Sequence, residues 1–235
     1  MDRAVEYLGQ FVPPPQDVGL MDGIVPRHIE KLPLQAVLQK LTRIPTGLRS
    51  ASLLGNAGFC QEGICILRIV DEIGEDVLFL SIGLIKNDWT DLHRSYLEYF
   101  FDEDFDLTSG QAVADRAPQV PRKKIRAYIT NSNSRTKDPS SQIFAAKVVH
   151  RMDSGYVHAS SPHIMDMYRG DPPAFQTKGL AGFPIQEDYE LRINSYYYRA
   201  CTSYAIACKA FGQEEVFQSF RDLMKIYTDI CDLLE

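Results

Sequence analysis

Hydrophobic residues recur every three or four positions through much of the chain, the spacing that places side chains on one face of an α-helix. The longest such pattern runs from Ile66 to Leu84 and keeps this spacing for about five helical turns. Three further apolar residues widen its hydrophobic face: Ile64, Leu67 and Leu78. The pattern predicts a central helix that is buried over much of its circumference.

The same period predicts helices before and after this one. They begin near Leu34, Asn87, Asp138, Ile193 and Glu214. The first is interrupted at Pro45, because proline removes a helical hydrogen bond. Gly212 makes a short joint between the last two helices, which is typical of antiparallel neighbours. We therefore expect an all-α fold, an antiparallel helical bundle of five to seven helices.

Proline and glycine mark the segments outside these helices. Residues 1–33 hold five prolines, which fix φ and remove donors, so we expect an extended Pro-rich N-terminal arm. A single bundle domain would then occupy residues 34–235. Residues 107–137 have the composition of a long, basic, poorly ordered connection. Residues 162–184 predict a second long loop, with room for one short β-hairpin at residues 175–183.

Composition excludes several classes of protein. The chain has 235 residues, of which 45% are hydrophobic and 24% charged, so intrinsic disorder is not expected. No run of eighteen apolar residues is present, and the N-terminus lacks the apolar region of a signal peptide. We therefore expect a cytoplasmic protein with no membrane partner. The five cysteines have no paired spacing with histidine, so neither a metal nor another cofactor is expected.

Charge is spread unevenly along the chain. The net charge is −6, yet the segment from Arg122 to Arg151 holds eight Lys or Arg and a single acid, Asp138. A concentrated basic segment in an acidic protein suggests a local anion site rather than general coating of nucleic acid. An ordinary solvated basic loop is the alternative.

One arginine and one histidine fall together in this region. Asp138 is a good N-cap and Pro139 a good first helical residue, so a helix should run from here to about Ser160. Arg151 and His158 are then two turns apart and share one face. A helix-face arginine paired with an acid, and a histidine near a helix C-terminus, explain the same pattern without any chemistry.

Other chemically interesting residues have ordinary explanations. Arg68 and Glu72 are four positions apart and predict an exposed intrahelical ion pair; if buried, they would orient other polar groups. His93 lies near an acidic tract, but acids after a helix are typical of solvated surface rather than a metal site. The tyrosines 196–198 have helical spacing that favours core packing over a stacking surface.

Two stretches resemble a known family. Residues 58–62, with 66–68 and 71–72, are similar to the "G...EA..LLR..LE" helix of a bacterial helical-bundle family of unknown function. Residues 156–160 are similar to the later "S.YVH.S" helix of that family. The family in turn resembles HEPN domains and phage-resistance proteins of the AbiV kind.

This resemblance implies metal-independent RNA cleavage at a site formed across a homodimer. HEPN ribonucleases carry an arginine, then four to six residues, then histidine, and Arg151 and His158 match the upper limit. His158 would act as general acid or base and Arg151 would stabilise charge on the phosphate. Supporting residues would be Arg68, Glu72, Ser154 and Tyr156. RNA phosphates would be bound by Arg122, Lys123, Lys124, Arg126 and Lys147.

Two interpretations from other classes fit the same residues. A non-catalytic helical interaction module would use the basic segment to contact an anionic partner or a cognate protein. A helical ligand-binding bundle would instead draw on the tyrosines and the long loop.

Overall fold

The computed structural model describes residues 1–20, 23–107, 109–132 and 153–234. The chain is mostly helical, which confirms the all-α expectation. Its helices are α1 (Asp2–Gly9), α2 (Pro33–Asn56), α3 (Cys60–Lys86), α4 (Asp91–Phe100), α5 (Arg122–Ser132), α7 (Ser161–Met165), α8 (Ile185–Ala210) and α9 (Glu214–Leu234). The chain also forms two antiparallel β-hairpins. One pairs β1 (Gln16–Leu20) with β2 (Gly23–Arg27), and the other pairs β3 (Tyr168–Arg169) with β4 (Ala174–Phe175).

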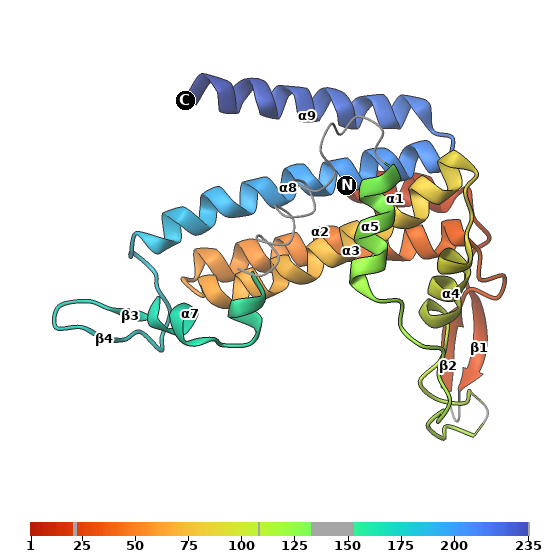
Figure 1. The fold of residues 1–235 in the computed structure, drawn as a ribbon, viewed down its shortest axis with the longest axis horizontal. Coiled ribbons are helices and arrows are strands. Elements are labelled where there is room, and N and C mark those ends of the chain that lie inside the picture. Colours follow the sequence, from red (N-terminus) through yellow and green to blue (C-terminus); the bar gives the residue numbers. More distant parts are fainter. Residues whose placement is uncertain (21–22, 108, 133–152, 235) are drawn as a thin grey trace.

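The long helices form a layered bundle (Figure 1). Helices α2, α3 and α8 pack against one another, and α9 lies on α8 at the outer edge of the bundle. The α3 pattern that begins at Ile66 therefore lies at the centre, as predicted. The core contains fully buried Leu41, Leu67, Leu80 and Tyr204. The Tyr204 hydroxyl donates a hydrogen bond to the Leu41 carbonyl at 2.8 Å, which satisfies its one buried polar group.

Tyr189 of α8 shows how closely the three central helices approach. Its hydroxyl donates to the Ala51 carbonyl of α2 at 2.7 Å. A Cβ atom added at Gly55 of α2, or at Gly63 of α3, would lie 2.1 Å from a Tyr189 atom. The ring thus fills space that only glycine leaves open, and burial raises the pKa of its hydroxyl.

Pro45 does not interrupt α2, contrary to the expectation from sequence. The helix is continuous from Pro33 to Asn56, and Pro45 is a buried residue within it. Tertiary packing on both sides of the proline, through fully buried Ile44 and Leu48, offsets the lost hydrogen bond.

Residues 1–33 are not one extended arm. Helix α1 places buried Ala4 and Leu8 against the core, and it packs on α2. The residues that follow Pro15 form the β1–β2 hairpin. Apolar side chains three and four positions apart at Ala4, Val5 and Leu8 explain α1, whereas the proline count suggested only extended chain.

The prediction for residues 107–137 was also wrong in part, because α5 occupies the second half of that segment. Together with α1 and the short α7, it raises the number of named helices in the described ranges above the five to seven expected. The hairpin predicted at residues 175–183 lies at residues 168–175 instead. Its strands are joined by an edge-to-face contact between Tyr168 and Phe175, with ring centroids 5.0 Å apart.

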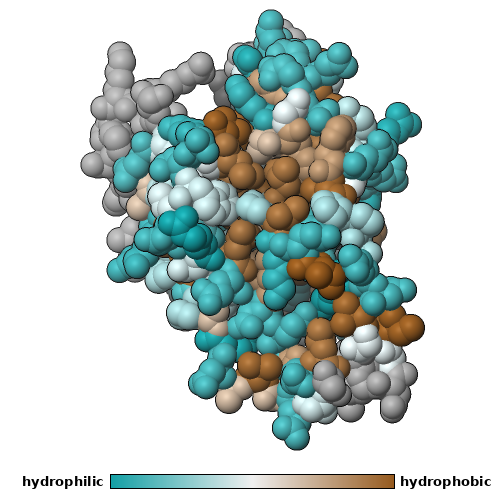
Figure 2. Space-filling view, turned by 90° about the vertical axis from the view of Figure 1, so that its right-hand side faces the viewer, coloured by the Kyte–Doolittle hydropathy of each residue, from teal (hydrophilic) through white to brown (hydrophobic). Residues whose placement is uncertain are grey.

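The end of the molecule with α4 and the β1–β2 hairpin carries hydrophobic side chains in a band among polar ones (Figure 2). Near this end Ile24, Ile29 and Phe105 each expose more than half of their surface. Within the described ranges, no helix has both the length and the apolar character needed to cross a membrane.

Candidate functional site

The structure describes only one member of the predicted catalytic pair. Residues 153–157 are helical, and His158 lies in the turn that follows, with its backbone N–H donating to the Ser154 carbonyl at 3.1 Å. The His158 side chain is exposed. Arg151 and Lys147 lie outside the described residues, as does most of the helix predicted from Asp138. Their pairing with His158 therefore stays a prediction.

Polar contacts fix the helical residues 153–157 that precede His158. Asp153 is completely buried and accepts hydrogen bonds from the Tyr196 hydroxyl and the Arg192 guanidinium of α8. The Tyr156 hydroxyl donates to Asp166 Oδ2 at 2.9 Å. Burial, followed by this hydrogen bond, raises the pKa of Tyr156 to about 12. Tyr156 is thus a neutral donor at neutral pH and is poorly suited to act as a base.

Gly155 allows the side chain of His163 to approach closely. A Cβ atom at Gly155 would lie 2.0 Å from Cε1 of His163. The imidazole of His163 lies edge-on to the Tyr156 ring, with centroids 4.3 Å apart, and its Nδ1 is 2.6 Å from the Ser160 hydroxyl. His163 therefore joins α7 to the helix end that presents His158.

A half-polar pocket of about 360 Å³ lies beside this helix end. Its lining residues are Ile64, Tyr156, Asp166, Arg169, Phe183, Pro184, Ile185, Asp188, Tyr189 and Arg192. The two guanidiniums are both engaged: Arg192 pairs with Asp153, and Arg169 Nη2 lies 3.7 Å from Asp166 Oδ1. The cavity is therefore polar, with its positive charges already balanced by carboxylates.

Arg122 and Arg126, two of the five residues predicted to bind phosphate, contact carboxylates of α3 instead. Arg122 donates to Glu75 Oε2 at 2.6 Å and also pairs with Asp76, while Arg126 donates to Glu75 Oε1 at 2.7 Å. Burial alone would lower the pKa of Arg122, but the two carboxylates outweigh it and raise that pKa. These arginines fasten α5 to α3 rather than offering themselves to phosphate.

Two lysines of the same segment remain at the surface. Lys123 and Lys124 on α5 are exposed, so they keep the surface position that phosphate binding needs. The sequence could not separate them from Arg122 and Arg126, because the acids that bind the arginines lie about fifty residues away on α3.

Arg68 and Glu72 form the predicted ion pair, but its environment differs from the prediction. The Arg68 side chain is buried at 9% exposure, whereas Glu72 keeps 39% of its side chain exposed. Arg68 is buried because α3 lies centrally in the bundle. The expectation of an exposed ion pair therefore holds for Glu72 but not for Arg68.

His93 is a buried core residue rather than a metal ligand. Its ring is fully buried and stacks on Phe79, with centroids 4.1 Å apart, and on Trp89 at 4.6 Å. The Thr90 N–H donates to Nδ1 at 3.2 Å, so Nε2 carries the proton and faces the Phe79 carbonyl at 3.3 Å. Among the described residues, no group of three or more His, Cys, Asp or Glu could hold a metal ion.

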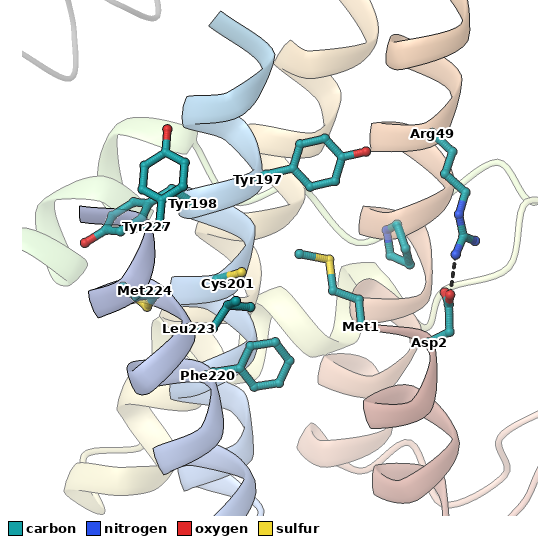
Figure 3. Close-up of a pocket in the computed structure, with 11 residues that line it drawn as sticks. Met1, Asp2, Arg49, Tyr197, Tyr198, Cys201, Phe220, Leu223, Met224 and Tyr227 are labelled. Atoms are coloured by element: carbon teal, nitrogen blue, oxygen red, sulfur yellow. Dashed lines mark hydrogen bonds and ion pairs between the residues drawn. The ribbon is translucent and has the colours of Figure 1, made fainter. Parts of the chain in front are cut away.

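An apolar pocket of about 400 Å³, which sequence reasoning did not locate, lies elsewhere in the bundle (Figure 3). Its walls come from the start of α1, the middle of α2, and facing parts of α8 and α9. The lining residues are Met1, Asp2, Pro45, Arg49, Tyr197, Tyr198, Cys201, Phe220, Leu223, Met224 and Tyr227.

The three consecutive tyrosines of α8 divide between core and pocket. Tyr196 is buried, as predicted, and bonds Asp153. Tyr197 and Tyr198 line the pocket instead. The Tyr198 ring lies 5.2 Å from that of Tyr227 on α9, and the Tyr197 hydroxyl is 3.3 Å from the Ser52 hydroxyl of α2. The tyrosine cluster was thus the one sequence signal of this pocket.

One ion pair stands at the edge of the otherwise apolar pocket. Arg49 of α2 pairs with Asp2 of α1, and the two side chains are 60% and 55% exposed. Figure 3 shows this pair on one side of the pocket, with Met1 between it and the α9 wall. Burial raises the pKa of the Cys201 thiol in the α8 wall, so this cysteine is a protonated apolar residue rather than a nucleophile.

Comparisons with known proteins give no match to this chain among family models, curated proteins or solved structures. The resemblance to HEPN-like bundles is therefore carried by its short motifs alone and stays a prediction. Function has to be argued from the geometry of the two pockets and of His158.

Proposed function

We propose that the chain is a helical ligand-binding module whose ligand is a small, largely apolar molecule held between α8 and α9. The observation that carries this proposal is the apolar pocket of about 400 Å³ described above. Pockets that bind small molecules have volumes of about 300 to 1,000 Å³ and are lined mainly by hydrophobic and aromatic side chains with a few polar groups. This cavity has both properties.

The side chains of the pocket suit an apolar ligand of adaptable shape. Met224 is flexible and polarisable, so it can follow different outlines. Tyr197 and Tyr198 offer flat apolar faces, and their hydroxyls supply hydrogen bonds without a net charge. Each Å² of apolar ligand surface removed from water contributes about 25 cal/mol, which supplies the driving force.

A pair of matched substitutions on α9 tests this function. Leu223 and Ile226 are both about half exposed, at 51% and 55%, but only Leu223 lines the pocket. Leu223→Trp should fill the cavity and weaken binding of the uncharged dye N-phenyl-1-naphthylamine at least tenfold, whereas Ile226→Trp should leave its affinity unchanged. Fluorescence titration measures both. Absence of dye binding by the wild-type chain, or equal loss in both variants, would contradict the proposal.

A second candidate is the metal-independent ribonuclease of the HEPN-like resemblance, with RNA as substrate and a homodimer as the active form. The observation in its favour is the exposed imidazole of His158, which is presented by a well-anchored helix end beside a pocket with two arginines. An exposed imidazole on a fixed helix end can reach a ribose 2′-hydroxyl, where cleavage requires a general acid or base.

RNA incubation without divalent metal tests this candidate. The wild-type chain should leave 2′,3′-cyclic phosphate ends on single-stranded RNA, and His158→Ala should lower the rate by a factor of 10² or more. His28→Ala, at the opposite end of the molecule beside the β1–β2 hairpin, is the control and should cleave normally. Intact RNA with every variant would remove the ribonuclease.

A further inference from the structure

Arg49 is the only arginine or lysine among the residues that line the apolar pocket, and Asp2 is the only acid. Arg49 comes from the middle of α2 and lines the pocket. Pro45, which is one turn earlier on the same helix, lines it too. The Arg49 guanidinium contacts the Asp2 carboxylate at the rim. The remaining lining side chains are uncharged. Met1 also brings the N-terminal ammonium group, whose charge acts on Cys201 in the α8 wall, so Arg49 is the one positively charged side chain of the pocket but not its one positive charge.

We propose that Arg49 is the anion-binding residue of this pocket and that the ligand is an amphiphilic monocarboxylate. Its carboxylate would take the position of the Asp2 carboxylate, and its aromatic or aliphatic body would lie against Tyr197, Met224 and Leu223. This inference rests on the proposed ligand-binding function and specifies the chemical class of the ligand.

The chemistry of the guanidinium favours this exchange. Arginine presents five N–H donors in a planar fork that matches the two oxygens of a carboxylate. The ion pair with Asp2 is exposed, and exposed ion pairs are weak and screened by salt. A ligand carboxylate can therefore replace Asp2 at little cost, while its apolar body gains contacts that the Asp2 side chain cannot make.

The position of the ion pair also explains why a neutral apolar ligand is a poorer fit. Such a ligand would lie in the same cavity and leave the Arg49–Asp2 pair as it is. A monocarboxylate of the same shape adds a charge-assisted contact at the rim, and such contacts are stronger than neutral ones. The pocket should therefore discriminate between a carboxylate and its uncharged isostere.

Displacement of N-phenyl-1-naphthylamine by 2-naphthoate and by 2-naphthamide measures this discrimination, because the two competitors share one ring system and differ in charge. On the wild-type chain 2-naphthoate should compete at least threefold better at low ionic strength. Asp2→Asn removes the internal competitor and should improve 2-naphthoate binding about two- to fivefold, with no change for 2-naphthamide.

Arg49→Met keeps the apolar stem of the side chain and should abolish the preference for 2-naphthoate over 2-naphthamide, with both competitors measured against the dye affinity of that same variant. Arg43→Met is the matched control, because Arg43 is exposed on the same helix and does not line the pocket. If the wild-type chain binds the dye but does not discriminate between the two competitors, the assignment of Arg49 as the anion-binding residue is wrong. The same holds if Arg49→Met discriminates as the wild type does. In both cases the proposed ligand-binding function still stands. A dye that binds no variant removes the proposed function and this assignment together.

Discussion

At the scale of single residues, His93 shows how burial decides what a titratable group can do. Its ring is stacked between Phe79 and Trp89, and Gly83 of α3 leaves the space for it, since a Cβ there would lie 2.6 Å from Nε2. Burial lowers the pKa of His93, and the hydrogen bond to the Phe79 carbonyl only partly opposes this. The sequence placed His93 near acids, but it could not show the aromatic cage.

The lowered pKa of His93 predicts a definite dependence of stability on pH. An unfolded histidine takes up a proton near pH 6.5, whereas folded His93 stays neutral to lower pH. The unfolded state then binds more protons, so this residue's contribution is complete above about pH 6.5 and is lost as pH falls toward the folded pKa. One proton gives a slope of at most about 1.4 kcal/mol per pH unit.

Urea unfolding at pH 7.5 and pH 5.5 checks this contribution. His93→Gln should be less stable than the wild type at both pH values, because the aromatic stacking is lost. Its loss of unfolding free energy between the two pH values should be smaller than that of the wild type. If the unfolding free energy of His93→Gln falls as much between the two pH values as that of the wild type, the assignment of this titration to His93 is refuted.

At the scale of elements, hydrophobic period was a reliable guide wherever a helix buries a continuous apolar face. Helices α3 and α9 follow their predicted patterns closely. Helix α5 was missed because only Ile125 in it is buried, and its attachment comes from arginines that bind Glu75 and Asp76 of α3. Long-range ion pairs leave no local signature in a sequence, so such helices resemble polar loops.

The two candidate sites also differ in how close together their residues lie in the sequence. His158 and Tyr156 could be named from the sequence because they are neighbours in it, and their role stays a prediction. The apolar pocket could not, since it joins Asp2, Arg49 and Leu223 from three separate helices. Only the folded arrangement of α1, α2, α8 and α9 brings these walls together.

At the scale of the whole molecule, the bundle depends on how closely α2, α3 and α8 approach one another. The Tyr189 hydroxyl donates a hydrogen bond to the Ala51 carbonyl, and its ring occupies space left open by Gly55 of α2 and Gly63 of α3. The ring is confined on two sides by α2 and α3, and its hydrogen bond fixes its position between these helices. A methyl group added on either flank must therefore separate the helices or displace the tyrosine from its hydrogen bond.

Gly63→Ala should for this reason destabilise the folded chain, although alanine favours helix more than glycine by about 1 kcal/mol. The new Cβ would lie 2.1 Å from the Tyr189 hydroxyl oxygen, and overpacking of this kind costs about 1 to 3 kcal/mol or more. We expect a net loss of about 1 to 2 kcal/mol in the unfolding free energy, measured by urea denaturation. Gly9→Ala is the control, because its nearest neighbour would be Leu38 at an ordinary 3.9 Å. Gly9→Ala should unfold at the wild-type urea concentration or slightly above it. Equal or greater stability of Gly63→Ala would mean that the three helices are less tightly fitted around Tyr189 than the contacts indicate.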